Sequence, residues 1–331
     1  MKAVVLTQYG SADKLQLTDI EKPTPQSDEV LIKIHASSIN AADKYLMNGS
    51  PFLVRLMTGG IFNPPKNKVL GADVAGVVEA IGTDVTTFKI GDEVFADISG
   101  IASGGYAEYV AVPESIVALK PSNISFEQAA SVPLAGVTAL QGLRDHAQLA
   151  AGQKILINGA SGGVGTFAVQ IAKYYGAEVT ATCSTSKIEM VRSIGADHVI
   201  DYKQDDFTKN GQQYDLIFDI AAYHSPADYK SSLKPQGKYI LAGGSIPRIF
   251  QVMLFGWWFS RNSQQTIANY MANPNQEDLE FMGTLLESGK VVPVIDKCFP
   301  LEQTADAMRY FETGSTQGKV VISTLGDGSK A

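Results

Sequence analysis

The chain divides, by its pattern of apolar positions, into a first part of short strands and a later part in which strands and helices alternate. In the first part, apolar runs at 30–36, 74–81, 93–96 and 106–112 are bounded by Gly, Pro, Asp or Ser, which favour turns. Several strands spaced roughly 8 to 15 residues apart predict a small barrel or sandwich.

The pattern changes near Ser125, a residue type that favours the first position before a helix. From there, helical stretches such as 167–175 and 187–194 separate five apolar strand runs, at 154–158, 178–182, 198–200, 216–219 and 238–241. This alternation predicts a parallel, doubly wound sheet. The tail beyond residue 275 contains strand runs at 291–295 and 319–322 with a helix between them, and we expect it to complete the first domain.

A glycine-rich turn joins the first strand of the alternating part to its helix. Residues 158–165 read Asn-Gly-Ala-Ser-Gly-Gly-Val-Gly, and small residues let the backbone approach a pyrophosphate at the helix N-terminus. We expect Ser161, Gly162, Gly163 and Val164 to bind it. Short-chain dehydrogenases share a similar run but need Tyr-x-x-x-Lys for proton transfer, and none of the 13 tyrosines has a lysine four positions later.

The end of the second strand indicates which nicotinamide cofactor binds. NAD enzymes place an acid there to bond the ribose 2′-hydroxyl, whereas residues 182–187 read Thr-Cys-Ser-Thr-Ser-Lys. Ser184 and Lys187 can bind a 2′-phosphate that an acid would repel. The alternative is that Ser184 only caps the next helix and Lys187 is solvated. We predict NADPH rather than NADH.

Composition and charge narrow the class of protein. The 331 residues carry a net charge of −7, which argues against a nucleic-acid-binding surface. The chain contains only 2 Cys and 4 His. Neither a disulfide framework nor a zinc lobe of four cysteines can be built from two. The most apolar stretch, residues 249–259, is shorter than the roughly 20 residues that span a bilayer. We expect a cytoplasmic protein with no membrane span and no nucleic-acid partner.

An ordered set of motifs now covers nearly the whole chain. It comprises residues 38–45 (Ser-Ile-Asn-Ala-Ala-Asp-Lys-Tyr), 71–78, 91–94, 104–109, 136–139, 158–165, 195–197, 243–244 and 318–321. In this order, the set resembles the zinc-independent quinone oxidoreductases of the medium-chain dehydrogenase/reductase superfamily, which include zeta-crystallin-like enone and quinone reductases. The resemblance implies an α/β fold with a GroES-like β-barrel domain (1–123 and 274–331), a Rossmann domain (124–273), and a homodimer.

The resemblance also implies a reaction. Zinc-dependent members place Cys at the position of Asn40 and Gly-His-Glu at Gly71-Ala72-Asp73, so both ligand positions differ here. The implied activity is metal-free hydride transfer from NADPH to a quinone or an α,β-unsaturated carbonyl. Two alternatives remain: a zinc-free carbonyl reductase or alcohol dehydrogenase, and an NADPH-binding or structural protein without turnover.

The family pattern assigns roles by position. Asn40 and Tyr45 are expected at the nicotinamide end, as donors to the oxygen that gains charge; the alternatives are a turn residue for Asn40 and packing between domains for Tyr45. Asp43 is expected to hold its loop. The remaining cofactor contacts are Thr138, Tyr202, Gly243, Gly244 and Lys319. Lys319 is the weakest of these, because a lysine at a strand edge is usually solvated.

Two apolar segments, 51–57 and 249–259, flank segments expected to line the cleft. They are either core or dimer interface, or a lipophilic substrate pocket or lid. In the second case Tyr45, Phe52, Phe255 and Trp257 contact the substrate.

Overall fold

The computed structural model describes residues 1–57, 68–99, 104–244, 246–261 and 264–324. The chain forms two compact units, one of residues 1–137, 273–289 and 293–331, and one of residues 138–272 and 290–292. The sequence assigns residues 124–137 to the second domain, whereas here they belong to the first unit. The reason is that helix α3 (Phe126–Ala130) packs against strands β3 (Glu29–Ser38) and β4 (Asp73–Ile81).

The first unit is built mainly from antiparallel strands. Its main sheet has the order β14-β15-β3-β4-β5-β7, with β6 also paired to β3, and β1 and β2 form a separate hairpin. The remaining strands are β1 (Lys2–Leu6), β2 (Leu15–Asp19), β5 (Glu93–Asp97), β6 (Tyr109–Pro113), β7 (Val117–Leu119), β14 (Ile295–Pro300) and β15 (Lys319–Ser323). Its remaining helices are η1 (Ala12–Lys14), α1 (Ala41–Asn48), α2 (Phe52–Met57), η2 (Glu114–Ile116), α9 (Gln276–Glu287), η5 (Leu301–Gln303) and α10 (Thr304–Glu312).

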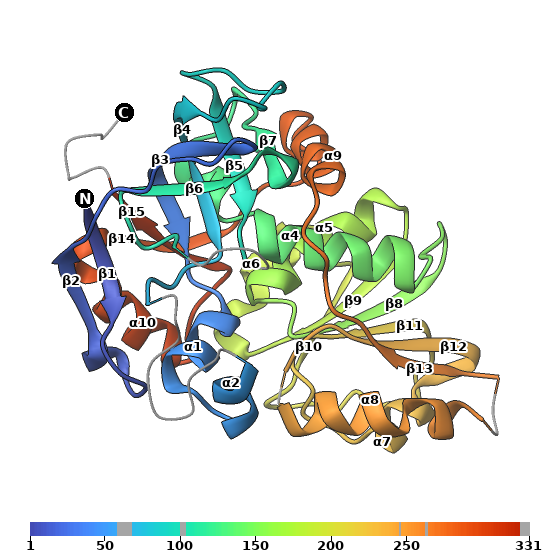
Figure 1. Cartoon of the computed structure of the whole chain (residues 1–331). Coiled ribbons are helices and arrows are strands. Elements are labelled where there is room, and N and C mark those ends of the chain that lie inside the picture. Colours follow the sequence, from blue (N-terminus) through green and yellow to red (C-terminus); the bar gives the residue numbers. More distant parts are fainter. Residues whose placement is uncertain (58–67, 100–103, 245, 262–263, 325–331) are drawn as a thin grey trace. The chain divides into compact units, whose positions relative to one another are not determined.

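The C-terminal part of the chain returns to this first unit. Strand β15 pairs antiparallel with β3, with Val321 opposite Ser38, and α10 packs against β15 (Figure 1). Val320 and Ile322 of β15 share a buried cluster with Ile39, Met47 and Tyr106. Lys319, at the start of β15, is thereby brought next to the segment that follows β3.

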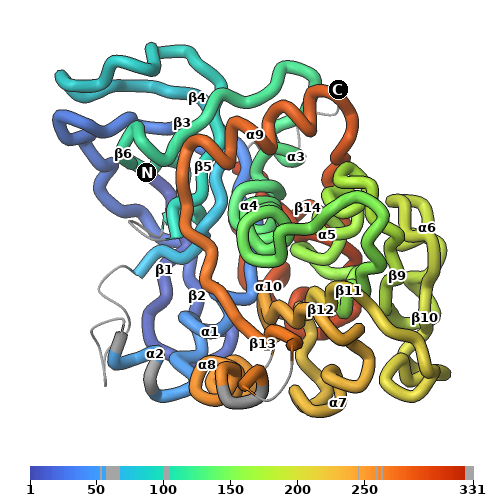
Figure 2. The backbone as a smooth tube through the Cα atoms, turned by 90° about the vertical axis from the view of Figure 1, so that its right-hand side faces the viewer, coloured from blue at the N-terminus to red at the C-terminus, as the bar shows by residue number. Residues whose placement is uncertain are grey.

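The second unit contains a parallel sheet of six described strands, in the order β10-β9-β8-β11-β12-β13. Helices α5 and α6 pack on β8, β9 and β10, and α7 and α8 pack on β12 and β13 (Figure 1). Figure 2 shows β9, β10 and α6 together at one edge of the sheet. The elements are β8 (Lys154–Asn158), α5 (Gly163–Tyr174), β9 (Glu178–Cys183), η4 (Thr185–Lys187), α6 (Ile188–Ser193), β10 (His198–Asp201), β11 (Tyr214–Asp219), α7 (Pro226–Ser231), β12 (Leu233–Leu241), α8 (Ile246–Ser260) and β13 (Thr266–Asn269). Helix α4 (Pro133–Gln141) and the π-helical turn η3 (Gly142–His146) precede β8.

The predicted two-domain architecture is confirmed: the first unit consists mainly of antiparallel strands, and the strand order of the second is that of a doubly wound dinucleotide-binding sheet. Two details were wrong. The run at 291–295 is not a strand; β14 begins only at Ile295, since Pro293 lacks the N–H that a ladder needs. A sixth strand, β13, was missed because only one of its four residues, Ile267, is buried, so the segment shows no apolar run. No described helix is long and apolar enough to cross a bilayer.

The turn between β8 and α5 depends on a close approach of two backbones. A Cβ atom on Gly165 would lie 2.2 Å from the carbonyl oxygen of Gly159, whereas a Cβ on Gly162 would meet only that same oxygen at 3.7 Å. Position 165 therefore excludes any side chain, and position 162 leaves space above the turn.

We predict that Gly165→Ala destabilises the protein by about 2 kcal/mol, because backbone must move to admit the methyl group. Gly162→Ala is the matched control and costs less than about 1 kcal/mol, since glycine has only a modest advantage before a helix. Chemical denaturation followed by circular dichroism measures both. Equal losses in the two variants would contradict the close-packing argument.

A buried pair of acids in the first unit makes stability depend on pH. Asp73 and Asp97 lie opposite each other on β4 and β5, and both are almost fully buried. Burial, followed by the nearby Asp73 carboxylate, raises the pKa of Asp97 from 3.8 to about 6. A raised carboxyl pKa means that the folded protein retains this proton more readily than the unfolded chain, so Asp97 opposes folding increasingly from about pH 4 upward and to its full extent above pH 6.

Asp97→Asn is therefore expected to stabilise the protein by about 2 to 3 kcal/mol at pH 8. The gain should shrink as the pH falls through 6 and vanish below about pH 4, where Asp97 is protonated in both states. Urea unfolding at pH 8 and pH 4 measures it, with the exposed Asp19→Asn as the control, expected to change stability by less than about 0.5 kcal/mol at both. A gain of equal size at both pH values would refute the electrostatic explanation.

Candidate functional site

The glycine-rich turn lies at the carboxyl end of β8, beside the point where the strand order of the sheet reverses between β8 and β11. Gly159 has a φ of +91°, and Gly162 directly precedes α5. The N–H groups of the first turn of α5 have no acceptor inside the helix. With the open space above Gly162, these groups fit a pyrophosphate.

A buried network of hydrogen bonds at the ends of the neighbouring strands supports this turn. Asn158, which ends β8, donates its side-chain amide to Asp219 Oδ1 at 2.9 Å and accepts a hydrogen bond from the Thr182 hydroxyl at 2.6 Å. Thr182 Oγ1 in turn accepts from the backbone N–H of Gly159 at 3.1 Å. The Tyr239 hydroxyl donates to Asp219 Oδ2 at 2.8 Å. The ends of β8, β9 and β11 are therefore joined beneath the turn.

The end of β9 carries the two residues predicted for a 2′-phosphate. Ser184 directly precedes η4 and Lys187 ends it, and both are largely buried. Asp201, at the end of β10, is the acid of this region. Its carboxylate accepts hydrogen bonds from the Thr185 hydroxyl and the Gln204 amide, and such donors lower its pKa.

The other predicted cofactor residues of the second unit lie near the same edge of the sheet. Tyr202 follows β10 and is half exposed, while Gly243 and Gly244 follow β12. Thr138 lies in α4, and its carbonyl accepts a hydrogen bond from the Tyr270 hydroxyl. The carboxyl edge of a doubly wound sheet is where dinucleotides bind, so this unit offers one continuous set of candidates.

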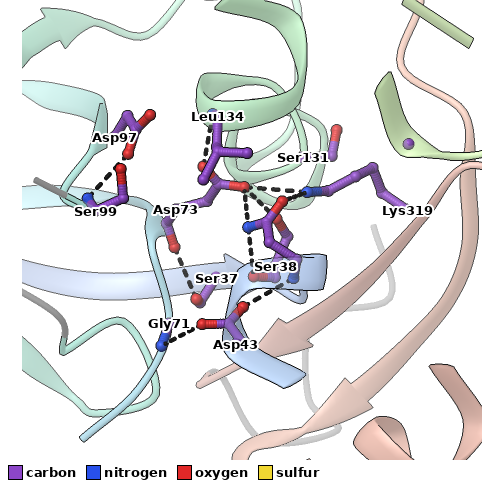
Figure 3. Close-up of polar contacts among 12 residues, drawn as sticks. Ser37, Ser38, Asp43, Gly71, Asp73, Asp97, Ser99, Ser131, Leu134 and Lys319 are labelled. Atoms are coloured by element: carbon purple, nitrogen blue, oxygen red, sulfur yellow. Dashed lines mark hydrogen bonds and ion pairs between the residues drawn. The ribbon is translucent and has the colours of Figure 1, made fainter. Parts of the chain in front are cut away.

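In the first unit, the Asp73 carboxylate accepts hydrogen bonds from donors on four segments of the chain. Oδ2 accepts from the Ser38 hydroxyl at 2.6 Å, the Asn40 amide at 2.9 Å and the Lys319 ammonium at 3.1 Å. Oδ1 accepts from the backbone N–H of Leu134 at 2.8 Å. Figure 3 shows Lys319 reaching Asp73 beside Ser38. Strands β3, β4 and β15 and the start of α4 therefore meet at this carboxylate.

Lys319 was predicted as the weakest of the cofactor contacts, and the alternative that it is simply a solvated lysine at a strand edge was wrong. Its side chain is 3% exposed and that of Asp73 is 0% exposed. Besides Asp73, the ammonium donates to Asn40 Oδ1 at 2.6 Å. The pairing of β15 with β3 places this lysine inside the unit, where only bonded acceptors make a buried charge tolerable. Two predicted site residues, Asn40 and Lys319, are therefore in direct contact.

Asp43 holds its loop, as the sequence indicates. Its carboxylate accepts from the backbone N–H groups of Asn40 at 2.8 Å and Gly71 at 3.1 Å, and from the Tyr106 hydroxyl at 2.9 Å. Burial raises the pKa of Asp43 to about 6, against the lowering effect of these donors. Asn40 directly precedes α1, so Asp43 fixes the start of that helix.

The residues predicted for a substrate pocket lie on three helices. Tyr45 is on α1 and Phe52 on α2, both in the first unit, whereas Phe255 and Trp257 are on α8 in the second. Phe52, Phe255 and Trp257 are each more than half exposed. Their sharing of one pocket stays a prediction.

Sequence reasoning missed the buried acids that organise both regions. Asp73 was noted as part of a family motif and as a position that differs from zinc-dependent relatives, Asp219 as a strand end, and Asn158 as a strand end and the start of the glycine-rich turn; no role was assigned to their side chains. A polar residue that ends a run of buried apolar residues was the available signal, since such a group must be paired by the fold.

A metal site was not expected. Among the residues that the structure describes, no three His, Cys, Asp or Glu side chains form a group that could hold a metal ion. At the positions where zinc-dependent relatives carry ligands, Asn40 Oδ1 and Asp73 Oδ2 are bonded to the Lys319 ammonium.

Comparison with known families agrees with this architecture. The family model described as alcohol dehydrogenase GroES-like domain matches residues 26–122, and the model described as zinc-binding dehydrogenase matches residues 194–322. Together they cover more than half of the chain.

Curated relatives and solved structures match almost the whole chain. It is 39% identical to a 2-methylene-furan-3-one reductase of Solanum lycopersicum, over 98% of this chain and 79% of that protein. It is 38% identical to an NADPH-dependent alkenal/one oxidoreductase of Arabidopsis thaliana, over 97% and 79%. The quinone oxidoreductase from Coxiella burnetii superposes with a TM-score of 0.87 at 30% identity, over 98% of this chain and 99% of that one. The chain therefore belongs to the medium-chain dehydrogenase/reductase superfamily, within its branch of quinone and alkenal oxidoreductases.

Proposed function

We propose that this protein is an NADPH-dependent oxidoreductase that reduces the conjugated double bond of α,β-unsaturated carbonyl compounds, and quinones, by hydride transfer. The observation that carries the proposal is the acid-free end of β9, with Ser184 and Lys187, beside a turn that fits a pyrophosphate. Relatives named as an alkenal/one oxidoreductase and a quinone oxidoreductase support the same reaction.

The second unit supplies binding and orientation. N–H groups at the start of α5 bind the pyrophosphate, and Ser184 and Lys187 bind the 2′-phosphate through charge-assisted hydrogen bonds. The network of Asn158, Thr182 and Asp219 keeps the turn in place before the cofactor arrives. When bound, NADPH supplies the hydride, so the protein's task is positioning.

The first unit supplies a hydrogen-bond donor. As hydride reaches the β-carbon of an enone, negative charge develops on the carbonyl oxygen. The Asn40 amide, which is 6% exposed, donates to this oxygen and stabilises the charge. Tyr45, five residues further along the chain on α1, is the second candidate donor. Water then protonates the α-carbon and completes the reduction.

The reaction proposed here needs no metal. A cation at the position of Asn40 and Asp73 would have to displace the Lys319 ammonium, which already satisfies both oxygens. A quinone or enone accepts hydride without the activation that alcohol oxidation requires.

The exposed apolar side chains of helix α8 indicate the class of substrate. Helix α8 carries a single charged residue, Arg248 in its first turn, and exposes Leu254, Phe255 and Trp257. Side chains of this kind suit a lipophilic substrate. The homodimer and the cytoplasmic location stay predictions from the sequence.

NADPH oxidation at 340 nm, against 1,2-naphthoquinone, enones of increasing chain length and saturated aldehydes, tests the function. We expect turnover with enones and quinones, a KM that falls as the chain lengthens, and little turnover with saturated aldehydes. Turnover confined to aldehydes or alcohols would indicate a carbonyl reductase. Tight NADPH binding without any turnover would indicate a binding protein.

Lys187→Ala is expected to raise the KM for NADPH about tenfold or more, because a charge-assisted bond to the phosphate is lost. The KM for NADH should change less than twofold. Steady-state kinetics with both cofactors measures the ratio, with the exposed Lys209→Ala as the control. Equal changes in the KM for NADPH and the KM for NADH would show that Lys187 does not bind the 2′-phosphate.

A further inference from the structure

The carboxamide of Asn40 lies between a buried cation and a buried anion. Its Oδ1 accepts from Lys319 Nζ at 2.6 Å, and its Nδ2 donates to Asp73 Oδ2 at 2.9 Å. Lys319 also donates to the same Asp73 oxygen at 3.1 Å. The three side chains form a closed triangle whose members are at most 6% exposed.

This triangle permits only one orientation of the amide. An ammonium group can only donate a hydrogen bond, and a carboxylate can only accept one. Rotating the carboxamide by half a turn would direct N–H groups at Lys319 and the carbonyl oxygen at Asp73. Both contacts would become repulsive, at a depth where water does not replace them.

The fixed orientation leaves one weakly held hydrogen. Nδ2 carries two hydrogens, of which the first is bonded to Asp73 at 2.9 Å. Among the described residues, the second has only the carbonyl oxygen of Ser38 at 3.4 Å, beyond the usual range for such a bond. Oδ1, by contrast, is occupied by a charged donor. Asn40 can therefore offer an N–H group to a ligand and cannot readily accept a hydrogen bond from one.

We infer that Lys319, paired with Asp73, is a positioning residue that fixes Asn40 as a hydrogen-bond donor and thereby selects ligands carrying an acceptor oxygen. The inference rests on the proposed function for its kinetic consequences, because the acceptor is then the carbonyl or quinone oxygen of the substrate. It assigns Lys319 a role through Asn40 and not through contact with NADPH.

A double-mutant cycle between Lys319→Met and Asn40→Ala tests the role. Because misplacing a catalytic group costs up to about a hundredfold, each single variant should lower kcat by tenfold to a hundredfold. The double variant should be no slower than Asn40→Ala alone, since Lys319 acts only through that amide. Losses that multiply, or a Lys319→Met variant with unchanged kcat, would overturn the inference.

A merely structural role of the ion pair has a separate signature. Lys319→Met leaves the Asp73 carboxylate buried without its counter-charge and should unfold at a lower temperature. Lys319→Met combined with Asp73→Asn removes both charges and should regain most of that stability without regaining kcat. If kcat returned together with stability, charge balance alone would explain Lys319.

The matched control is the Lys234–Asp215 pair of the second unit, whose Nζ–Oδ2 distance is 2.7 Å at the surface. Lys234→Met combined with Asp215→Asn should leave kcat within twofold of the wild type. A large loss of kcat in this control would mean that removing any lysine–aspartate pair impairs turnover, and would count against a specific role of Lys319.

The orientation of Asn40 can be observed without turnover. In a ¹⁵N-labelled protein, the Asn40 side-chain amide pair, assigned by its loss in Asn40→Ala, should show two well-separated proton shifts that move in Lys319→Met. Unchanged signals would contradict the positioning role. If these signals move while the wild type reduces no substrate, the proposed function fails and the positioning role stands.

Discussion

The first unit depends on the requirement that the buried carboxylate of Asp73 be fully bonded. An uncompensated charge at this depth would cost several kcal/mol, yet its two oxygens accept four hydrogen bonds from Ser38, Asn40, Leu134 and Lys319. These donors come from segments as far apart as 246 residues. The arrangement of β3, β4, β15 and the start of α4 must therefore form as a whole.

The second unit satisfies the same requirement with a different acid. Asp219 accepts from Asn158, Tyr239 and the backbone N–H groups of Ala221 and Ala222. All of these donors are neutral, unlike the Lys319 ammonium that bonds Asp73. The acid lies where the strand order reverses, so its bonds hold the ends of adjacent strands and the turn above them. In each unit, a buried carboxylate joins several elements through its hydrogen bonds.

Local features were predictable from the sequence, and non-local pairings were not. The glycine turn, the alternation of strands and helices, and the capping of α3 by Ser125 follow from neighbouring residues. The position of Lys319 does not, because its burial follows from the pairing of β15 with β3 across most of the chain. Strand β13 shows a further limit, since only Ile267 of its four residues is buried and the segment therefore has no apolar run.

A donor held by an ion pair also explains why conjugated acceptors suit this site. Hydride transfer to an isolated carbonyl leaves a strongly basic alkoxide, which needs a cation or an acid at the oxygen. Hydride transfer to an enone or quinone leaves a charge delocalised over several atoms, and such an oxygen is much less basic. A neutral amide such as that of Asn40 can stabilise it if its hydrogen is already oriented, since preorganised donors need no rearrangement during the reaction. Lys319 and Asp73 provide that orientation. The same ammonium is hydrogen-bonded to both Asn40 Oδ1 and Asp73 Oδ2, so under the proposed function the site favours a delocalised anion over an alkoxide.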